Sequence, residues 1–262
     1  HGRDYEFARG GERSVARGYT KAVEKARSLI YLEDQYVWGH HVANVFAEAL
    51  REHRELHVIA VVPLHPDRDG ALARNPQLLG RRRAMLDMVE AAPDRVAVYG
   101  IENRAGTPVY VHAKCCVVDD TWATIGSDNF NRRSWTHDSE LSAVVLDRDS
   151  GGDDPHSGYA RRLRLTLAAE HLDRTMGTSG QPLAAMTDCV DAAGMFAAFE
   201  QSAARLDRWH DGGCVGPKPP GRLRRMRPPE LGRLSRALAL APYLFLHDPD
   251  GRPRALRRRD DF

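Results

Sequence analysis

The strongest constraint on the fold is an alternation of helical and strand patterns over the first hundred residues. Apolar residues recur at helical spacing in three stretches, residues 14–26, 42–50 and 75–91. Apolar runs typical of buried strands lie between them, over residues 29–32, 56–62 and 96–99. This alternation predicts a sheet with helices packed on its faces. In the third helix we expect Leu86 to face the core and Arg81 to face solvent.

After residue 100 the pattern changes to closely spaced strands. We predict strands over residues 109–118, 122–125 and 140–146. Asp119 and Asp120 form a tight turn between the first two, and residues 126–137 form a long loop before the third. Later helices are predicted from about residue 159 and over residues 189–209.

Charge is concentrated at the C-terminal end of the sequence. Residues 218–262 carry a net charge of +7 and the remainder −5, although the whole chain is +2. A basic, proline-containing segment can lie on anionic lipid or nucleic acid. Because charge runs are more often solvated surfaces, we expect a solvated tail. The sequence contains no apolar run of the roughly 20 residues that a transmembrane helix needs.

One segment brings together residues that suit phosphate chemistry. At fixed spacings it contains His112, Lys114, Asp119, Gly126, Ser127 and Asn129. On a strand, His112 and Lys114 would point to one face, about 7 Å apart along the chain. An imidazole and an ammonium together form a natural receptor for a phosphate.

The other residues of the segment suit supporting roles. Gly126 allows the chain to turn, while Ser127 and Asn129 can offer polar contacts near the same place. Asp119, at the strand end, is better placed to brace the turn than to touch a substrate. The adjacent cysteines at 115 and 116 point to opposite faces and cannot both bind one metal ion, so we expect no metal site.

The spacing HxKx4Dx6GSxN resembles the motif of the phospholipase D superfamily at every fixed position. Asn131, residues 133–134 and residues 138–140 resemble the segment that follows this motif. Residues 30–36, IYLEDQY, resemble the IYxExQY element that precedes the second motif in lipid-acting members. The resemblance spans residues 29–146.

The resemblance implies an α/β fold, a mixed sheet flanked by helices, as one of two pseudo-symmetric halves. It implies a phosphodiesterase that uses no metal or cofactor, in which one histidine forms a phosphohistidine and another protonates the leaving alcohol. By position, the catalytic motif is His112, Lys114 and Asp119, with His112 expected to be the acid and base and Asp119 a structural support. Phosphate binding falls to Lys114 and Asn129, and supporting roles to Ser127, Glu140 and Gly126.

The chain departs from the family because no second histidine has a lysine two residues later. We expect a C-terminal half of a two-motif enzyme, weakly active or inactive alone, which needs an N-terminal half or a second subunit as its partner. The IYxExQY element and the absence of an initiator Met before His1 favour this reading. The alternative is a single-motif, endonuclease-like phosphodiesterase that is active as a homodimer, although such members are shorter.

Phospholipids are the expected substrate class, hydrolysed or transphosphatidylated at their head groups. Nucleic acid, a cardiolipin-synthase-like transfer and a non-catalytic half stay open as alternatives. We expect a catalytic half over residues 1–175, a helical extension over 176–217 and an Arg/Pro-rich tail over 218–262. Free thiols and the lack of a signal peptide favour a cytoplasmic or peripheral membrane location.

Overall fold

The computed structural model describes residues 6–66, 70–147, 158–174, 184–259 and 262. Its strands are β1 (Leu29–Asp34), β2 (His57–Val61), β3 (Val96–Ile101), β4 (Lys114–Val118), β5 (Trp122–Gly126), β6 (Ser142–Leu146) and β7 (Leu223–Arg225). Its α-helices are α1 (Ser14–Lys25), α2 (His40–Glu52), α3 (Ala71–Ala91), α4 (Arg132–Thr136), α5 (Tyr159–His171), α6 (Ala192–Asp211), α7 (Arg233–Pro242) and α8 (Arg254–Arg259). A 3-10 helix, η1 (Ala184–Cys189), and a π-helical turn, η2 (Tyr243–His247), complete the elements.

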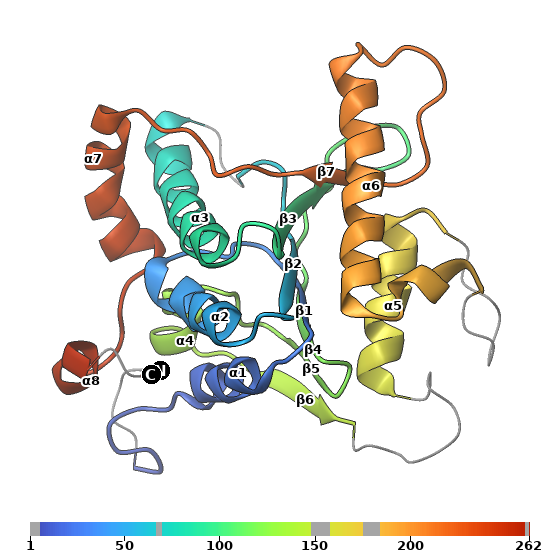
Figure 1. Cartoon of the computed structure of the whole chain (residues 1–262). Helices are drawn as coiled ribbons and strands as arrows, with labels where there is room; N and C mark the ends of the chain where they lie inside the picture. The colour runs from blue at the N-terminus through green and yellow to red at the C-terminus, as the bar shows by residue number, and fades with distance from the viewer. Residues whose placement is uncertain (1–5, 67–69, 148–157, 175–183, 260–261) are drawn as a thin grey trace.

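The seven strands form one mixed sheet in the order β6-β5-β4-β1-β2-β3-β7. Helices α1, α2 and α3 cover one face, and α5 and α6 cover the other (Figure 1). Strands β1, β2 and β3 are parallel, and every residue of β1 is buried, as expected for strands covered on both faces. The predicted mixed α/β fold is confirmed.

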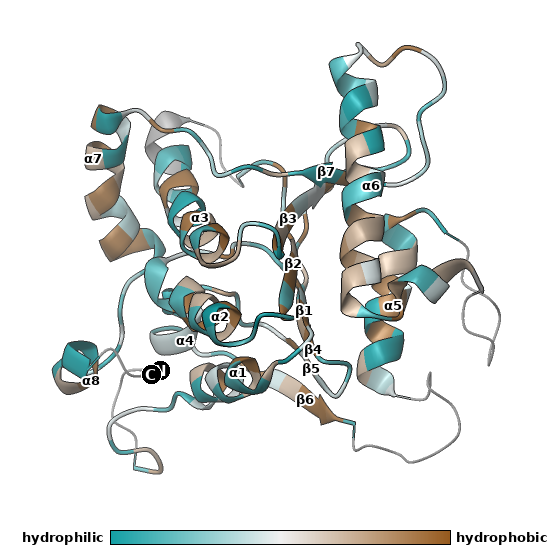
Figure 2. Ribbon diagram, viewed as in Figure 1, coloured by the Kyte–Doolittle hydropathy of each residue, from teal (hydrophilic) through white to brown (hydrophobic). Residues whose placement is uncertain are grey.

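Side-chain alternation along β1 divides the core into two layers. Ile30 and Leu32 pack with Phe46 under α1 to α3, while Tyr31 packs with Phe199 of α6 on the other face. The helices on both faces of the sheet carry hydrophobic and hydrophilic residues in alternating bands, as amphipathic helices do (Figure 2). Among the described helices, none has the length and apolar composition needed to cross a bilayer.

The antiparallel side of the sheet is built from hairpins. Asp119 and Asp120 connect β4 to β5 with φ angles of 48° and 57°, the left-handed pair that a type I′ turn needs, and this confirms the predicted turn. The strand expected over residues 109–118 begins only at Lys114. Its neighbour β1 ends at Asp34, whose Oδ1 accepts hydrogen bonds from the amides of Tyr36 (2.7 Å) and Val37 (3.0 Å) and turns the chain away. Residues 109–113 therefore have no β1 backbone to pair with.

The loop expected over residues 126–137 contains the short helix α4. Asn131 caps this helix, because its Oδ1 accepts a hydrogen bond from the Ser134 amide at 2.7 Å. The prediction of a loop over all of these residues was wrong. The Asn131 cap begins a helix two residues after Asn129, the last residue of the motif.

The predicted inner and outer faces of α3 were also partly wrong. Arg81 is only 4% exposed and donates to the carbonyl of Pro63 at 2.8 Å, whereas Leu86 is 39% exposed. Helix α7 packs on α3 from outside, so α3 has a second covered side. Burial lowers the pKa of Arg81 to about 10.

The C-terminal segment is folded, which corrects the expectation of a solvated tail. Strand β7 pairs antiparallel with β3, with Arg225 opposite Tyr99. Arg252, expected in solvent, is 1% exposed and lies between Asp250 and the ring of Phe262. The sheet and its outer helices therefore continue across the expected boundary at residue 217.

Candidate active site

Strand register brings two residues of the motif, Lys114 and Gly126, to one end of the sheet. Lys114 at the start of β4 lies opposite Asp34 at the end of β1. Gly126 at the end of β5 lies opposite Ser142 at the start of β6. Because β4, β5 and β6 are antiparallel, the residues flanking these four strand ends converge. Carboxyl ends of parallel strands are also where α/β sheets bind ligands.

The ammonium group of Lys114 is held by a small polar network. Its Nζ donates to Oε1 of Gln35 and to the backbone carbonyl of His112, both at 3.1 Å. Burial lowers the pKa of Lys114, and nearby carboxyl groups oppose this lowering. Those carboxyl groups belong to Asp34, Glu140 and Asp128.

Asp34 is fully buried, as is Asp128. Burial raises the pKa of Asp34 to about 6, although backbone amides hydrogen-bond to it and Lys114 attracts its charge. The turn that follows it places Val37 at φ 51°, an unusual angle for a β-branched residue. The chain thus leaves β1 sharply beside the Lys114 ammonium.

His112 lies two residues before β4, and its side chain is exposed. Strand alternation therefore does not set its direction, and that part of the sequence argument was wrong. Its ring instead stacks on Tyr110, with centroids 6.2 Å apart and planes 22° apart. The Tyr110 hydroxyl accepts a hydrogen bond from Nε2 of Gln35 at 2.5 Å. Gln35 therefore contacts both Lys114 and Tyr110, the residue on whose ring His112 stacks.

Gln35 and Tyr110 were not among the predicted site residues. Gln35 belongs to the IYxExQY element, so the sequence carried a signal for it. Tyr110 had no comparable signal, because its contribution depends on where the turn after β1 places Gln35.

Ser127 and Glu140 form a pair beside Gly126. The Ser127 hydroxyl donates to Oε2 of Glu140 at 2.5 Å and accepts from the Leu141 amide at 3.1 Å. A Cβ at Gly126 would lie 2.8 Å from the carbonyl oxygen of Leu141. This turn therefore requires glycine for close backbone approach.

Asn129 is 9% exposed, and no described residue donates a hydrogen bond to its Oδ1. It lines a cleft of about 500 Å³, which neither His112 nor Lys114 lines. Aromatic and polar side chains form the rest of the wall, namely Tyr36, Trp38, Gln77, Asn131, Arg133, Ser134, Asp138, Leu246 and His247.

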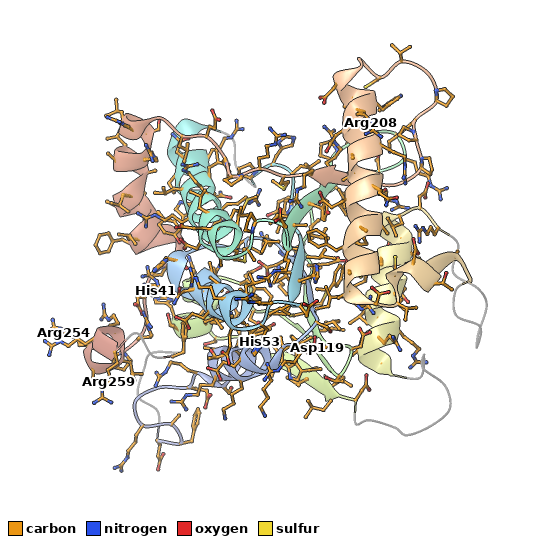
Figure 3. The ribbon with its side chains drawn as sticks, viewed as in Figure 1. His41, His53, Asp119, Arg208, Arg254 and Arg259 are labelled. Carbon is orange, nitrogen blue, oxygen red and sulfur yellow. The ribbon has the colours of Figure 1, made fainter. Side chains whose placement is uncertain are left out.

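Asp119 lies at the other end of β4, away from Lys114 (Figure 3). Its carboxylate accepts hydrogen bonds from the amides of Arg27 (2.6 Å), Ser28 (2.9 Å) and Leu29 (2.8 Å). The Ser28 hydroxyl also donates to it, at 2.8 Å. Asp119 thus ties the β4–β5 turn to the start of β1.

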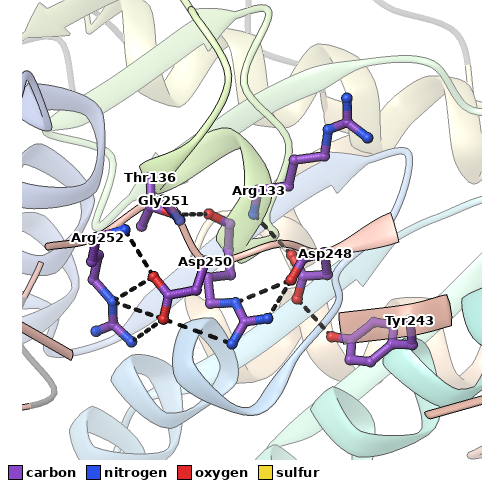
Figure 4. Close-up of polar contacts among 8 residues, drawn as sticks. Arg133, Thr136, Tyr243, Asp248, Asp250, Gly251 and Arg252 are labelled. Carbon is purple, nitrogen blue, oxygen red and sulfur yellow. Dashed lines mark hydrogen bonds and ion pairs between the residues drawn. The ribbon is translucent and has the colours of Figure 1, made fainter. Parts of the chain in front are cut away.

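A C-terminal clasp, which we define as residues 248–252, fixes the segment that follows Asn129 (Figure 4). Asp248 accepts from the Arg133 amide at 2.8 Å and from the Tyr243 hydroxyl at 2.6 Å. The Arg132 guanidinium donates to the backbone carbonyl of Asp248, and the Gly251 amide donates to Thr136 Oγ1 at 2.9 Å. The clasp therefore holds α4 and one wall of the cleft.

Within the described ranges, no three His, Cys, Asp or Glu side chains cluster so as to hold a metal ion. Cys115 and Cys116 are both buried, and burial raises the pKa of both thiols. The site offers an imidazole, an ammonium, amides and hydroxyls that can bind an anion, beside the carboxyl groups of Asp34, Asp128 and Glu140.

Comparison with known proteins points to one family. The family model described as "Cardiolipin synthase, PLD-like domain" matches residues 22–151. Phospholipase D zeta 1 of Arabidopsis thaliana is 26% identical over 225 residues, covering 68% of this chain and 20% of the relative. Phospholipase D1 of Homo sapiens is 25% identical over 201 residues, covering 59% of this chain and 18% of the relative. The chain therefore spans about a fifth of the length of these relatives.

Solved structures of the same family are also similar. Nuc from Salmonella typhimurium, a phospholipase D family member, is 17% identical, with a TM-score of 0.41 over 61% of this chain and 86% of that one. Phosphatidylserine synthase of Haemophilus influenzae is 14% identical, with a TM-score of 0.44 over 78% of this chain and 45% of that one. The motif spacing, the family model and the curated phospholipase D relatives identify this chain as a member of the phospholipase D superfamily.

Proposed function

We propose that this chain supplies one half of the active site of a phospholipase D-type phosphodiesterase acting on phospholipids. The observation that carries the proposal is the strand register, which brings Lys114 at the start of β4 and Gly126 at the end of β5 to one end of the sheet. The exposed imidazole of His112 precedes β4 by two residues, and the buried amide of Asn129 follows β5 by three residues. The curated relatives are phospholipases D, which supports a phospholipid substrate.

His112 is the proton donor and acceptor in this mechanism. A histidine of the motif that this chain lacks attacks phosphorus, the bond from phosphorus to the leaving oxygen breaks, and His112 protonates that oxygen. His112 then takes a proton from water, whose oxygen bonds to phosphorus while the phosphorus–nitrogen bond breaks. Both histidines return to their starting state. The exposed position of His112 lets its ring reach a substrate and exchange protons with solvent.

Lys114 and Asn129 bind the non-bridging oxygens of the phosphate. Preorganised donors of this kind stabilise charge that develops in a transition state. Gln35 positions Lys114 through the 3.1 Å contact with its Nζ, and it also holds Tyr110 against His112. One amide thus positions both the phosphate-binding and the proton-transfer group.

The other motif of the active site comes, in this proposal, from an N-terminal half. This chain contains one histidine with a lysine two residues later, and it spans about a fifth of its phospholipase D relatives. Reading the coding sequence before His1 for a second HxKx4D in frame is the simplest check. Homodimerisation is the competing source of a second motif.

Turnover of phosphatidylcholine and of bis-(p-nitrophenyl) phosphate tests the proposal, with the chain alone and with the N-terminal half added. We expect activity only in the assembled enzyme, and His112→Ala to lower it by about 10²- to 10⁴-fold. His57→Ala is the matched control, because His57 lies at the opposite end of the sheet, beside Leu29. Full activity of His112→Ala would refute the mechanism, and full activity of the chain alone as a dimer would refute the half-site.

Transfer to an alcohol uses the same phosphohistidine, and the matching family model carries the name of cardiolipin synthase. Adding glycerol to the assay distinguishes the outcomes, since transfer yields phosphatidylglycerol and hydrolysis yields phosphatidic acid. Nuclease activity that falls steeply with salt would instead favour a nucleic-acid substrate.

A further inference from the structure

We propose that the outer surface of α7, η2 and α8 docks on an anionic phospholipid bilayer and so brings the cleft to the head groups. The inference rests on the proposed function only in what the docking achieves, which is to bring the cleft to its lipid substrate. The surface itself is defined by contacts and exposure that do not depend on catalysis.

The segment from α7 through η2 has two apolar faces. Its inner face carries Ala239 and Tyr243, which pack with Trp38 and Leu79. Its outer face exposes Leu234 (73%), Leu238 (66%) and Phe245 (76%). These three are separated by four and seven residues, the spacing of one helical stripe. Because only the inner face is packed, the outer face of this segment keeps its apolar side chains exposed to solvent.

The segments before and after the outer apolar stripe expose arginines. Within residues 227–259 the exposed charged residues are one acid, Glu230, and six arginines, namely Arg227, Arg233, Arg254, Arg257, Arg258 and Arg259. Asp248 and Asp250 lie inside the clasp and do not offset this charge at the surface. Asp260 and Asp261 lie outside the described residues. Helices α7 and α8 occupy the same outer side, and Arg254 and Arg259 point away from the body (Figure 3).

Exposed apolar side chains flanked by cations favour a bilayer with anionic head groups. Such helices bury their apolar face at the boundary between head groups and acyl chains, and nearby arginines add attraction to anionic lipid. A protein partner would have to supply acidic side chains to pair with these arginines, and no feature of the described surface points to such a partner.

The apolar stripe adjoins the cleft, and this position favours a lipid surface as the partner. Leu246, next to Phe245, is 68% exposed and also lines the cleft with His247. Asn129 lines the same cleft. Insertion of Phe245 to the acyl boundary would therefore bring the mouth of the cleft to the depth of lipid phosphates.

Vesicle sedimentation of the full chain tests the inference without catalysis. We expect binding to phosphatidylcholine vesicles that contain phosphatidylglycerol, little binding to pure phosphatidylcholine, and weaker binding at high salt. The double variant Leu238→Glu/Phe245→Glu and the triple variant Arg257→Glu/Arg258→Glu/Arg259→Glu should each weaken binding by about tenfold or more. The control is Val215→Glu, because Val215 is an 80% exposed apolar residue in the loop after α6.

Two further readouts keep the outcomes distinct. Far-UV circular dichroism must match that of the wild type, and turnover of bis-(p-nitrophenyl) phosphate by the assembled enzyme should be unchanged in the double variant. If the wild type binds anionic vesicles but the assembled enzyme shows no turnover, the proposed function is refuted and the docking surface is not. Equal binding of the variants and the wild type, or loss of association with the N-terminal half instead of with vesicles, would overturn the docking surface.

Discussion

Removal of the Asp248 carboxylate should destabilise the fold measurably. The side chain is 1% exposed and accepts hydrogen bonds from the Tyr243 hydroxyl (2.6 Å) and the Arg133 amide (2.8 Å). Asp248→Ala leaves both donors without this acceptor, at a cost of about 1–3 kcal/mol each. Burial raises the pKa of Asp248, so loss of the charge also relieves some desolvation. We therefore expect the free energy of unfolding to fall by about 2–4 kcal/mol.

Urea denaturation followed by circular dichroism measures this loss. Asp248→Asn, which keeps an acceptor oxygen of the same size, should lose less than Asp248→Ala. Asp94→Ala removes an exposed acid before β3 and should stay within about 0.5 kcal/mol of the wild type. A midpoint for Asp248→Ala equal to that of Asp94→Ala would refute the idea that the clasp holds α4.

Three further substitutions test the site and its supports. Asp34→Asn should remove a pH dependence of stability. The folded pKa of Asp34, about 6, exceeds the unfolded value of 3.8, so the unfolding free energy of the wild type falls by about 3 kcal/mol as pH rises from about 4 to 6. The unfolding free energy of the variant, measured by urea titration, should change less across that range. Gly126→Ala should cost about 1–3 kcal/mol, because the new Cβ would meet the Leu141 carbonyl at 2.8 Å, and a Tm equal to that of the wild type would exclude this clash. Asp119→Ala should lower the unfolding free energy by about 1–3 kcal/mol through loss of the amide contacts at the start of β1, while unchanged urea stability would mean that the brace is dispensable.

The central sheet was predictable because its signals are local. Alternating helical and strand patterns specify β1 to β3 and their helices without knowledge of any distant contact. The turn at Asp119 and Asp120 was predictable for the same reason. The early end of pairing at Lys114 was not, since it depends on Asp34 turning the neighbouring strand.

Errors at Arg81 and in the C-terminal segment have a different cause. Arginine is usually exposed to solvent, whereas buried Arg81 donates a hydrogen bond to the Pro63 carbonyl and is attracted by the charge of Asp34. The Arg-rich segment has a charge typical of a tail, yet Arg225 lies opposite Tyr99 of β3 and the backbone carbonyl of Asp248 accepts a hydrogen bond from Arg132. These contacts join residues that are distant in sequence.

The motif spacing singles out Lys114 and Gly126, which the structure brings to one end of the sheet because strands β4 and β5 are adjacent in sequence and in space. It could not reveal that Leu246 and His247 line the cleft. More than one hundred residues separate them from Asn129, and no local pattern encodes that contact. The roles of His112, Lys114 and Asn129 stay predictions.

The most direct test of the mechanism compares leaving groups in the first turnover of the assembled enzyme. A choline alkoxide needs a proton as it leaves, whereas p-nitrophenolate leaves without one. We expect His112→Ala to slow release of choline from phosphatidylcholine by about 10²- to 10⁴-fold and to slow release of p-nitrophenol from phosphatidyl-p-nitrophenol far less. Equal losses with both leaving groups would contradict the acid role of His112, and no loss with either would contradict its place in the active site.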